Sequence, residues 1–159
     1  MQPVPSTHLV FALDHTGLVI PDLDSAVAFY VAAFGMTVVS RESDTDVSSS
    51  AIGLPGEKVR LRGAILQAGT VRLELHQYLT PVGTGVRRVC DTGFGHIAFA
   101  VHDIDDAYRF LINQGVTFNT EPQLISTGGL AGRRWVYGQD PWGNVIELGQ
   151  NPSNESGPA

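Results

Sequence analysis

Apolar positions recur at helical spacing in two stretches of the chain. In residues 23–34 and 104–111, large apolar side chains return every three or four residues, which predicts two amphipathic helices. Each stretch follows an aspartate, Asp22 or Asp103, whose carboxylate can accept hydrogen bonds from the backbone N–H groups at a helix N-terminus. We therefore expect both helices to begin at these positions and to lay one apolar face on a sheet.

Apolar and polar positions alternate in "VRLELHQY", residues 71–78, which predicts a strand. Side chains two residues apart in a strand point to the same face, so Arg72, Glu74 and His76 share one face. The other face is apolar and consists of Val71, Leu73 and Leu75. A strand at the surface can turn such a polar face to water, so this stretch alone does not establish a site.

The chain contains an internal repeat that begins with a histidine. The segment "DHTGLVIPDLDSAVAFYVAAFGMTV" at 14–38 is similar to "GHIAFAVHDIDDAYRFLINQGVTF" at 95–118, and His15 aligns with His96. A glycine follows the predicted helix in each copy, where it can take the left-handed conformation that ends a helix. Each copy therefore reads as a strand, a helix and a further strand.

The repeat extends to the last strand of each copy. There "LELHQ" matches "IELGQ", which aligns Glu74 with Glu147. A duplicated fold must keep its apolar positions in step, but it has no structural need to keep a histidine and a glutamate in strands that otherwise read as core. We interpret the repeated histidine and glutamate as parts of a site rather than as solvated residues.

The repeat predicts an α+β fold built from two βαβββ modules. The expected parts are a first module at 9–79, a linker rich in glycine and proline at 80–93, a second module at 94–150 and a flexible tail at 151–159. Within the modules, residues 42–63 and 119–132 are expected to be connections between strands.

Two such modules, related by a pseudo-twofold axis, would bring four polar side chains together: His15, Glu74, His96 and Glu147. Two neutral imidazoles and two carboxylates suit a divalent first-row metal and leave positions for water or for substrate oxygens. Glycine or alanine stands two positions beyond three of these residues, which leaves space for a bound molecule. The sequence thus predicts a metal centre that opens on a cavity.

Composition narrows the classes of partner. Of the 159 residues, 43% are hydrophobic and 16% charged, as in ordinary globular domains. A net charge of -6 without a basic run argues against nucleic acid, and no apolar stretch is long enough to span a membrane. No secretory signal is recognisable at the start, and the single cysteine, Cys90, fits a reducing compartment. We expect a cytoplasmic protein with a small-molecule partner.

Three segments, "DHTGLVIPDLDSAVAFY", "GHIAFAVHDIDDAY" and "DPWGNVIELGQ", resemble the vicinal oxygen chelate superfamily. This superfamily includes glyoxalase I, methylmalonyl-CoA epimerase, extradiol dioxygenases and fosfomycin-resistance proteins. The resemblance covers about residues 9–150 and implies paired modules whose strands form a curled mixed sheet around a central metal cavity. Carried onto this chain, it implies one divalent ion (Zn, Ni, Co, Mn or Fe) held by His15, Glu74, His96 and Glu147.

The resemblance also implies a reaction. A carboxylate at the position of Glu74 favours the glyoxalase and epimerase branches, because ring-cleaving dioxygenases use three ligands that would exclude it. In the favoured branches the enzyme is a lyase or isomerase that transfers a proton next to a metal-chelated carbonyl. Glu147 and Glu74 are the candidate bases, and His76 is a further candidate because imidazole exchanges protons near neutral pH.

Two further side chains are candidates for substrate binding. Arg72 shares the face of Glu74 and could hold a substrate carboxylate. In the predicted strand "RRWVYGQD", one of Arg133 and Arg134 should face inward, and Tyr137 or Trp135 should line the cavity. The sequence does not decide which arginine faces inward, and we take Tyr137 as the candidate for substrate contact.

Two other classes of function remain open. An Fe(II)-dependent dioxygenase would keep its activity after loss of Glu74 but not after loss of His15. A small-molecule (antibiotic-like) binding protein of this superfamily would generally lack the metal ligands. Small members of the superfamily usually form homodimers, which we expect here, with the modules paired within one chain or exchanged between two.

Overall fold

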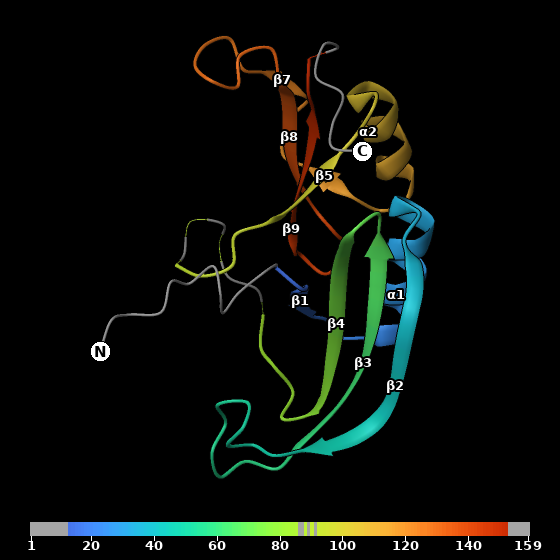
Figure 1. Cartoon of the computed structure of the whole chain (residues 1–159), viewed down its shortest axis with the longest axis vertical. Helices are drawn as coiled ribbons and strands as arrows, with labels where there is room; N and C mark the ends of the chain where they lie inside the picture. The colour runs from blue at the N-terminus through green and yellow to red at the C-terminus, as the bar shows by residue number, and fades with distance from the viewer. Residues whose placement is uncertain (1–12, 86–87, 89, 91, 153–159) are drawn as a thin grey trace, which may run out of the picture. The chain divides into compact units, whose positions relative to one another are not determined.

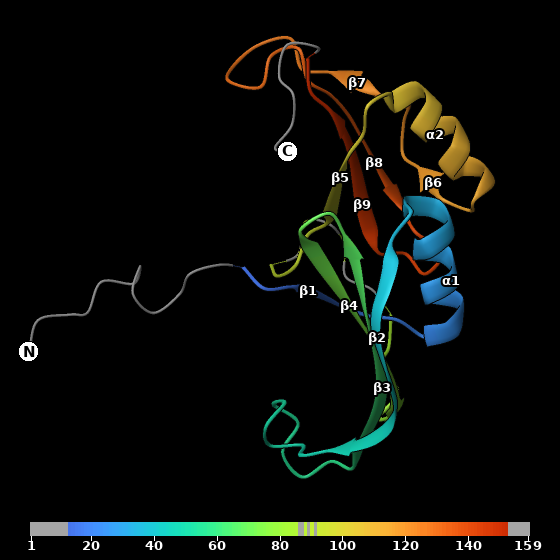
Figure 2. The ribbon, with the colours of Figure 1, turned by 45° about the vertical axis from the view of Figure 1, so that its right-hand side comes forward.

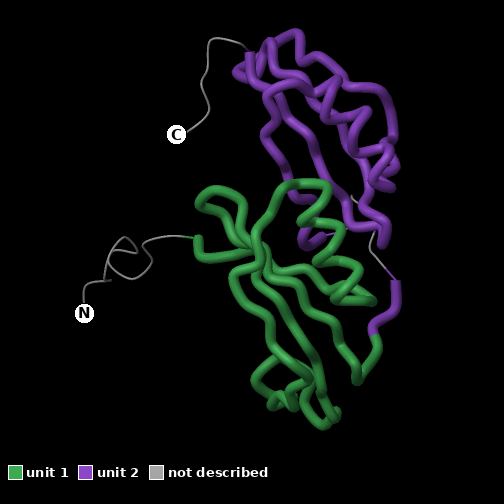
Figure 3. The backbone as a smooth tube through the Cα atoms, turned by 90° about the vertical axis from the view of Figure 1, so that its right-hand side faces the viewer, with its two compact units in different colours: residues 1–82 green, residues 83–159 purple. Residues whose placement is uncertain are grey.

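The chain folds into two compact units, residues 1–82 and 83–159 (Figure 3). We describe them from a computed structural model, which covers residues 13–85, 88, 90 and 92–152. Each unit contains one mixed sheet and one helix (Figure 1), so the predicted α+β class is confirmed. No helix within these ranges is both long and apolar enough to cross a membrane.

Unit 1 is a βαβββ module, as the sequence predicts. Its elements in chain order are β1 (Thr16–Val19), α1 (Leu23–Phe34), β2 (Thr37–Val47), β3 (Val59–Ala68) and β4 (Val71–Thr80). The sheet order is β1-β4-β3-β2, with β1 parallel to β4 and the other pairs antiparallel. Because β1 and β4 are direct neighbours, residues at the start of the module lie beside residues near its end.

Helix α1 lies along one face of the unit 1 sheet (Figure 2). Its apolar stripe is buried there, with Tyr30 and Ala26 fully enclosed. Leu66 and Leu75 project from β3 and β4 into the same core and are equally inaccessible. Since the inner sheet face is filled by these apolar side chains, Arg72, Glu74 and His76 of β4 lie on the face that α1 does not cover.

Unit 2 has the same order of elements as unit 1, except that two short strands replace one long strand. Its elements are β5 (Ile97–Ala100), α2 (Ile104–Asn113), β6 (Thr117–Phe118), β7 (Gln123–Leu124), β8 (Arg134–Gln139) and β9 (Val145–Gln150). β5 runs parallel to β9, and β8 runs antiparallel to β9. The two-residue strands β6 and β7 both pair with β8, where unit 1 has the single long strand β2. The prediction of a second βαβββ module is therefore correct except for this split strand.

The helix ends follow the predicted capping. The Asp22 carboxylate accepts a hydrogen bond from the Ser25 backbone N–H, and the Asp103 carboxylate accepts two, from Asp105 and Asp106. Gly35 ends α1 with a φ of 63°, the left-handed conformation that favours glycine.

A repeated glutamine ties each helix to the last strand of its unit. The side-chain oxygen of Gln77 accepts a hydrogen bond from the Leu23 backbone N–H at 2.9 Å. In unit 2, Gln150 accepts the equivalent bond from Ile104, also at 2.9 Å. Each glutamine satisfies a donor that a helix N-terminus leaves free, which fixes the helix start against the strand that carries the glutamate.

Three local expectations are wrong. Only residues 48–58 form a connection, whereas the rest of the range 42–63 is strand: β2 continues to Val47, β3 begins at Val59, and the two strands pair with each other. Val71 is 62% exposed at the start of β4, whereas Leu73 and Leu75 are buried as expected. His15 and His96 each precede the first residue of a strand rather than lying within it. The expected tail at 151–159 lies outside the described residues from residue 153 onward.

Candidate functional site

In unit 1, a histidine and a glutamate come together across the parallel pair of strands. His15 directly precedes β1, and the register pairs Gly17 of β1 with Glu74 of β4. The His15 Nε2 atom lies 3.3 Å from Glu74 Oε2. A Cβ atom at Gly17 would lie 3.9 Å from the same carboxylate, so this small residue leaves the space above β1 open. The His15 side chain is 38% exposed and the Glu74 side chain is 26% exposed, so both are accessible to solvent in part.

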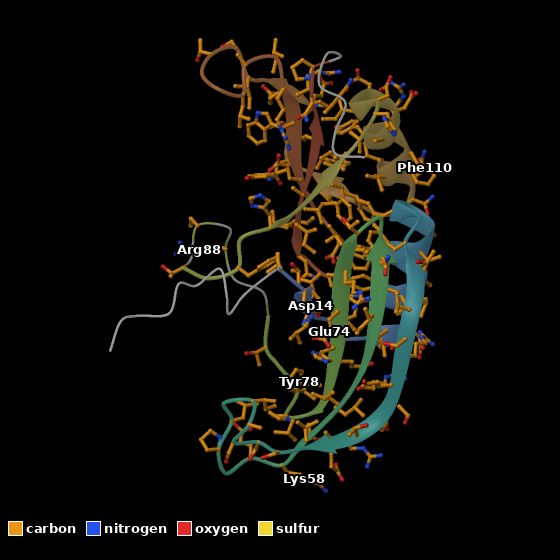
Figure 4. All side chains as sticks on the ribbon, in the orientation of Figure 1. Asp14, Lys58, Glu74, Tyr78, Arg88 and Phe110 are labelled. Carbon is orange, nitrogen blue, oxygen red and sulfur yellow. The ribbon has the colours of Figure 1, made fainter. Side chains whose placement is uncertain are left out.

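The other nitrogen of the His15 imidazole is held by a neighbour. His15 Nδ1 lies 2.8 Å from Asp14 Oδ2, a contact that directs Nε2 toward Glu74. Asp14 and Glu74 are labelled in Figure 4. The hydrogen bond to Asp14 raises the pKa of His15 above its usual value, and Glu74 adds to this effect. The same hydrogen bond lowers the pKa of Asp14. A carboxylate on the second nitrogen is the arrangement that orients histidine ligands in many metal sites.

His76 completes the unit 1 group. Its Nε2 lies 3.6 Å from Glu74 Oε1, the carboxylate oxygen that His15 does not contact. The facing residue on β3 is Gly63, where a Cβ would come within 3.0 Å of the His76 ring. Gly63 therefore provides the room in which the imidazole lies. A shallow depression opens here, lined by Ser40, Glu42, Gly63, Ala64, Ile65, Glu74 and His76.

Unit 2 contains the same histidine–glutamate pair. His96 directly precedes β5, and its Nε2 lies 3.2 Å from Glu147 Oε2 on the neighbouring strand β9. Tyr137 of β8 faces Glu147 across the sheet, and its hydroxyl lies 3.5 Å from His96 Nδ1. Burial raises the pKa of the Tyr137 phenol, and the Glu147 charge adds to the rise, so the hydroxyl stays protonated and can donate a hydrogen bond.

Arg133 is a further member of the unit 2 group. Its Nη2 donates to Glu147 Oε1 at 3.3 Å, and its Nη1 donates to Asn151 Oδ1 at 3.1 Å. The adjacent Arg134 instead makes two hydrogen bonds with Asp105, at the start of α2. Of the two arginines between which the sequence does not decide, Arg133 is therefore the one that contacts a predicted site residue.

The remaining predicted residues are placed as follows. Arg72 lies near Asp14, with Nη1 3.9 Å from Oδ1, and its side chain is 45% exposed. Cys90 is exposed. Over the described part of the chain, no group of three or more His, Cys, Asp or Glu side chains is arranged to hold a metal ion. Each unit thus brings one predicted histidine and one predicted glutamate together, and the four-ligand set stays a prediction.

The chain is similar to proteins of one superfamily. Residues 12–148 match the family model described as the Glyoxalase/Bleomycin resistance protein/Dioxygenase superfamily. A 2-epi-5-epi-valiolone epimerase from Actinomyces sp is 34% identical over 152 residues, in an alignment that covers 86% of this chain and 78% of the epimerase. A solved glyoxalase family protein from Bacillus cereus has the same fold, with a TM-score of 0.74 at 22% identity, over 91% of this chain and 96% of that one.

A longer relative is also similar. A lactoylglutathione lyase from Schizosaccharomyces pombe is 29% identical over 151 residues, covering 87% of this chain. The alignment covers 47% of the lyase, so this chain spans about half the length of that enzyme.

Proposed function

Because this chain belongs to the Glyoxalase/Bleomycin resistance protein/Dioxygenase superfamily, we propose that it is a divalent-metal-dependent lyase or isomerase of the glyoxalase and epimerase type. It would transfer a proton next to the metal-chelated carbonyl of a small molecule. The names of two relatives, an epimerase and a lactoylglutathione lyase, support an enzyme of this kind. The single cysteine supports action in a reducing cytoplasm.

The observation that carries the proposal is the repeated histidine–glutamate pair. In both units an imidazole Nε2 and a carboxylate Oε2 approach within 3.2–3.3 Å. These are the atoms that zinc, nickel, cobalt, manganese and iron accept as ligands, so the donor set fits such an ion. Our proposal assigns His15, Glu74, His96 and Glu147 as its ligands. The ion, when bound, supplies a Lewis acid that polarises the substrate carbonyl.

The proton-transfer role is best supported for unit 1. One oxygen of Glu147 accepts a hydrogen bond from the guanidinium of Arg133, a group that does not take up a proton from a carboxyl. The corresponding oxygen of Glu74 faces His76, an imidazole that can receive or return a proton. We therefore assign Glu74 and His76 as the favoured proton-transfer pair and Glu147 as a ligand, a narrower choice than the sequence allowed.

Substrate contacts are proposed for two residues. The Tyr137 hydroxyl, kept protonated, can donate to a substrate oxygen near His96. Arg72, whose side chain is 45% exposed and whose Nη1 lies 3.9 Å from Asp14 Oδ1, would bind a carboxylate of the substrate. We propose a homodimer as the assembly, which sedimentation analysis would test.

Elemental analysis of protein purified without added metal or chelator tests the proposal first. We expect about one equivalent of zinc, nickel, cobalt or manganese per chain. Predominantly iron, with oxygen uptake in the presence of catechols, would favour the dioxygenase instead. A protein that binds no metal even after reconstitution would contradict the metal-dependent function and leave a small-molecule binding protein.

Turnover can be tested before the substrate is known. α-Hydroxycarbonyl compounds, hemithioacetals and acyl thioesters would be incubated with the metal-loaded protein in deuterated water. Proton transfer beside a carbonyl incorporates deuterium at that carbon, which NMR detects even when substrate and product have the same mass. Metal-loaded protein in which His15 is replaced by alanine should incorporate no more deuterium than the buffer control.

A further inference from the structure

Glu74 and Glu147 each contact two nitrogen-bearing side chains, one at each carboxylate oxygen. In both, Oε2 faces the histidine that precedes the neighbouring strand. The other oxygen differs between the units: Oε1 of Glu74 faces His76, and Oε1 of Glu147 accepts a hydrogen bond from Arg133. Both glutamates thus have a contact at Oε1, but the partner is a histidine in unit 1 and an arginine in unit 2.

Arg133 does not stand at the unit 2 position that is equivalent to His76 in the repeat. His76 stands two positions after Glu74 on the same strand, and the equivalent position in unit 2 is Gly149. A Cβ atom at Gly149 would lie 2.1 Å from Arg133 Nη2 and 2.8 Å from its Cζ. The guanidinium thus lies directly against the Gly149 backbone, in the space that a side chain at this position would occupy.

The contact between Arg133 and Glu147 is mostly buried and is supported by a second hydrogen bond of Arg133. Arg133 is 26% exposed and Glu147 14%, so the pair is largely removed from water. A second hydrogen bond, from Nη1 to Asn151 Oδ1, holds the other arm of the planar guanidinium. These two hydrogen bonds restrict rotation of the Arg133 guanidinium, and this in turn restricts rotation of the Glu147 carboxylate.

We propose that Arg133 is the positioning residue of Glu147: it fixes the orientation of the carboxylate, so that Oε2 remains available beside His96 for a divalent metal ion. Gly149 is the second part of this device, because it admits the guanidinium. The inference rests on the proposed metal-dependent function and adds to it a residue that touches neither metal nor substrate. Hydrogen-bonding partners of ligating carboxylates typically contribute about 10- to 100-fold to metal affinity.

The experiment is a Co²⁺ titration of the chelator-treated full chain, read by visible absorption and by competition with a chromophoric chelator. Arg133→Met should weaken the Co²⁺ affinity about tenfold or more and alter the ligand-field spectrum. Arg133→Lys, which keeps a donor and the charge, should recover part of the loss. Gly149→Ala displaces the guanidinium without removing it and should weaken affinity in the same direction.

Arg109→Met is the matched control, because Arg109 pairs with Asp106 on the exposed side of α2. It removes the same charge and should leave the affinity unchanged. Wild-type binding together with an unchanged or tighter affinity in Arg133→Met would overturn the role of Arg133 while leaving the metal site intact. Failure of the wild-type chain to bind Co²⁺ would overturn the metal-dependent function and this role with it.

Discussion

The two units carry the same histidine–glutamate pair but surround it differently. In unit 1 the pair is flanked by Asp14 and by the imidazole of His76. In unit 2 it is flanked by the hydroxyl of Tyr137 and the guanidinium of Arg133. The repeat preserves the atoms suited to a metal, whereas the groups around them have diverged. An enzyme that must bind an ion and also move a proton can divide the two tasks between such unequal halves.

The largest expected effect separates the two glutamates. Glu74→Gln retains an oxygen ligand but cannot accept a proton, so we expect it to keep metal and to lose about 10²- to 10⁴-fold in turnover. Glu147→Gln loses the charge that pairs with Arg133, so we expect its main defect in metal content. Deuterium incorporation and elemental analysis on the same samples measure both effects.

Glu57→Gln is the control for these variants, because Glu57 is an exposed residue in the connection between β2 and β3. Near-normal turnover in Glu74→Gln would contradict the division of tasks. It would favour Glu147, the other candidate base, as the group that takes the proton.

A second comparison concerns the cores. Leu75 in β4 and Leu148 in β9 occupy equivalent positions next to the glutamates, and both are fully buried. Replacing either by alanine should lower the free energy of unfolding by about 2–5 kcal/mol, through lost burial and a cavity. Urea unfolding followed by fluorescence and circular dichroism measures this loss.

The shape of the unfolding transition sharpens the comparison. If the units unfold together, both variants shift one transition. If they unfold separately, each variant shifts only the transition of its own unit. A loss well below 1 kcal/mol in either variant would contradict the burial described above.

A smaller difference is expected at the helix N-termini. Asp103 accepts two backbone hydrogen bonds and Asp22 accepts one. Both alanine variants should be destabilised by about 0.5–2 kcal/mol, with Asp103→Ala at the upper end. Thermal unfolding measures the difference, and Asp103→Asn, which keeps the acceptor oxygen, should recover most of the loss. Equal stability of Asp103→Ala and wild type would show that the cap contributes nothing.

The features predicted correctly from sequence depend on short-range patterns. The caps Asp22 and Asp103 and the terminal Gly35 act within one helical turn, so the local sequence reveals them. The repeat also indicated which histidine and glutamate belong together. Within each unit they meet because the first and last strands of the module are parallel neighbours.

The features that the sequence left undecided depend on contacts between distant residues. Strand alternation could not choose between Arg133 and Arg134, because Arg133 precedes β8 and its side chain crosses to Gly149. The available signal was the glycine that replaces His76 in the repeat, but a glycine alone does not say what fills its space. The long pairing of β2 with β3 was missed because β2 is almost entirely exposed and lacks an apolar alternation.

The smallest effect concerns His15. The Asp14 hydrogen bond raises the pKa of His15, so Asp14→Asn should lower the pH at which the metal-free His15 ring loses its proton, as followed by NMR. Because the folded pKa is raised, the stabilising contribution is present at low pH and is lost as pH rises through that value. Wild type should therefore exceed Asp14→Asn in stability most between about pH 5 and 6, where both partners are charged, and least above about pH 8. Asp24→Asn removes the same charge beside Arg41 instead and should leave the His15 titration unmoved, so a shift of equal size in both variants would show a general charge effect rather than this hydrogen bond.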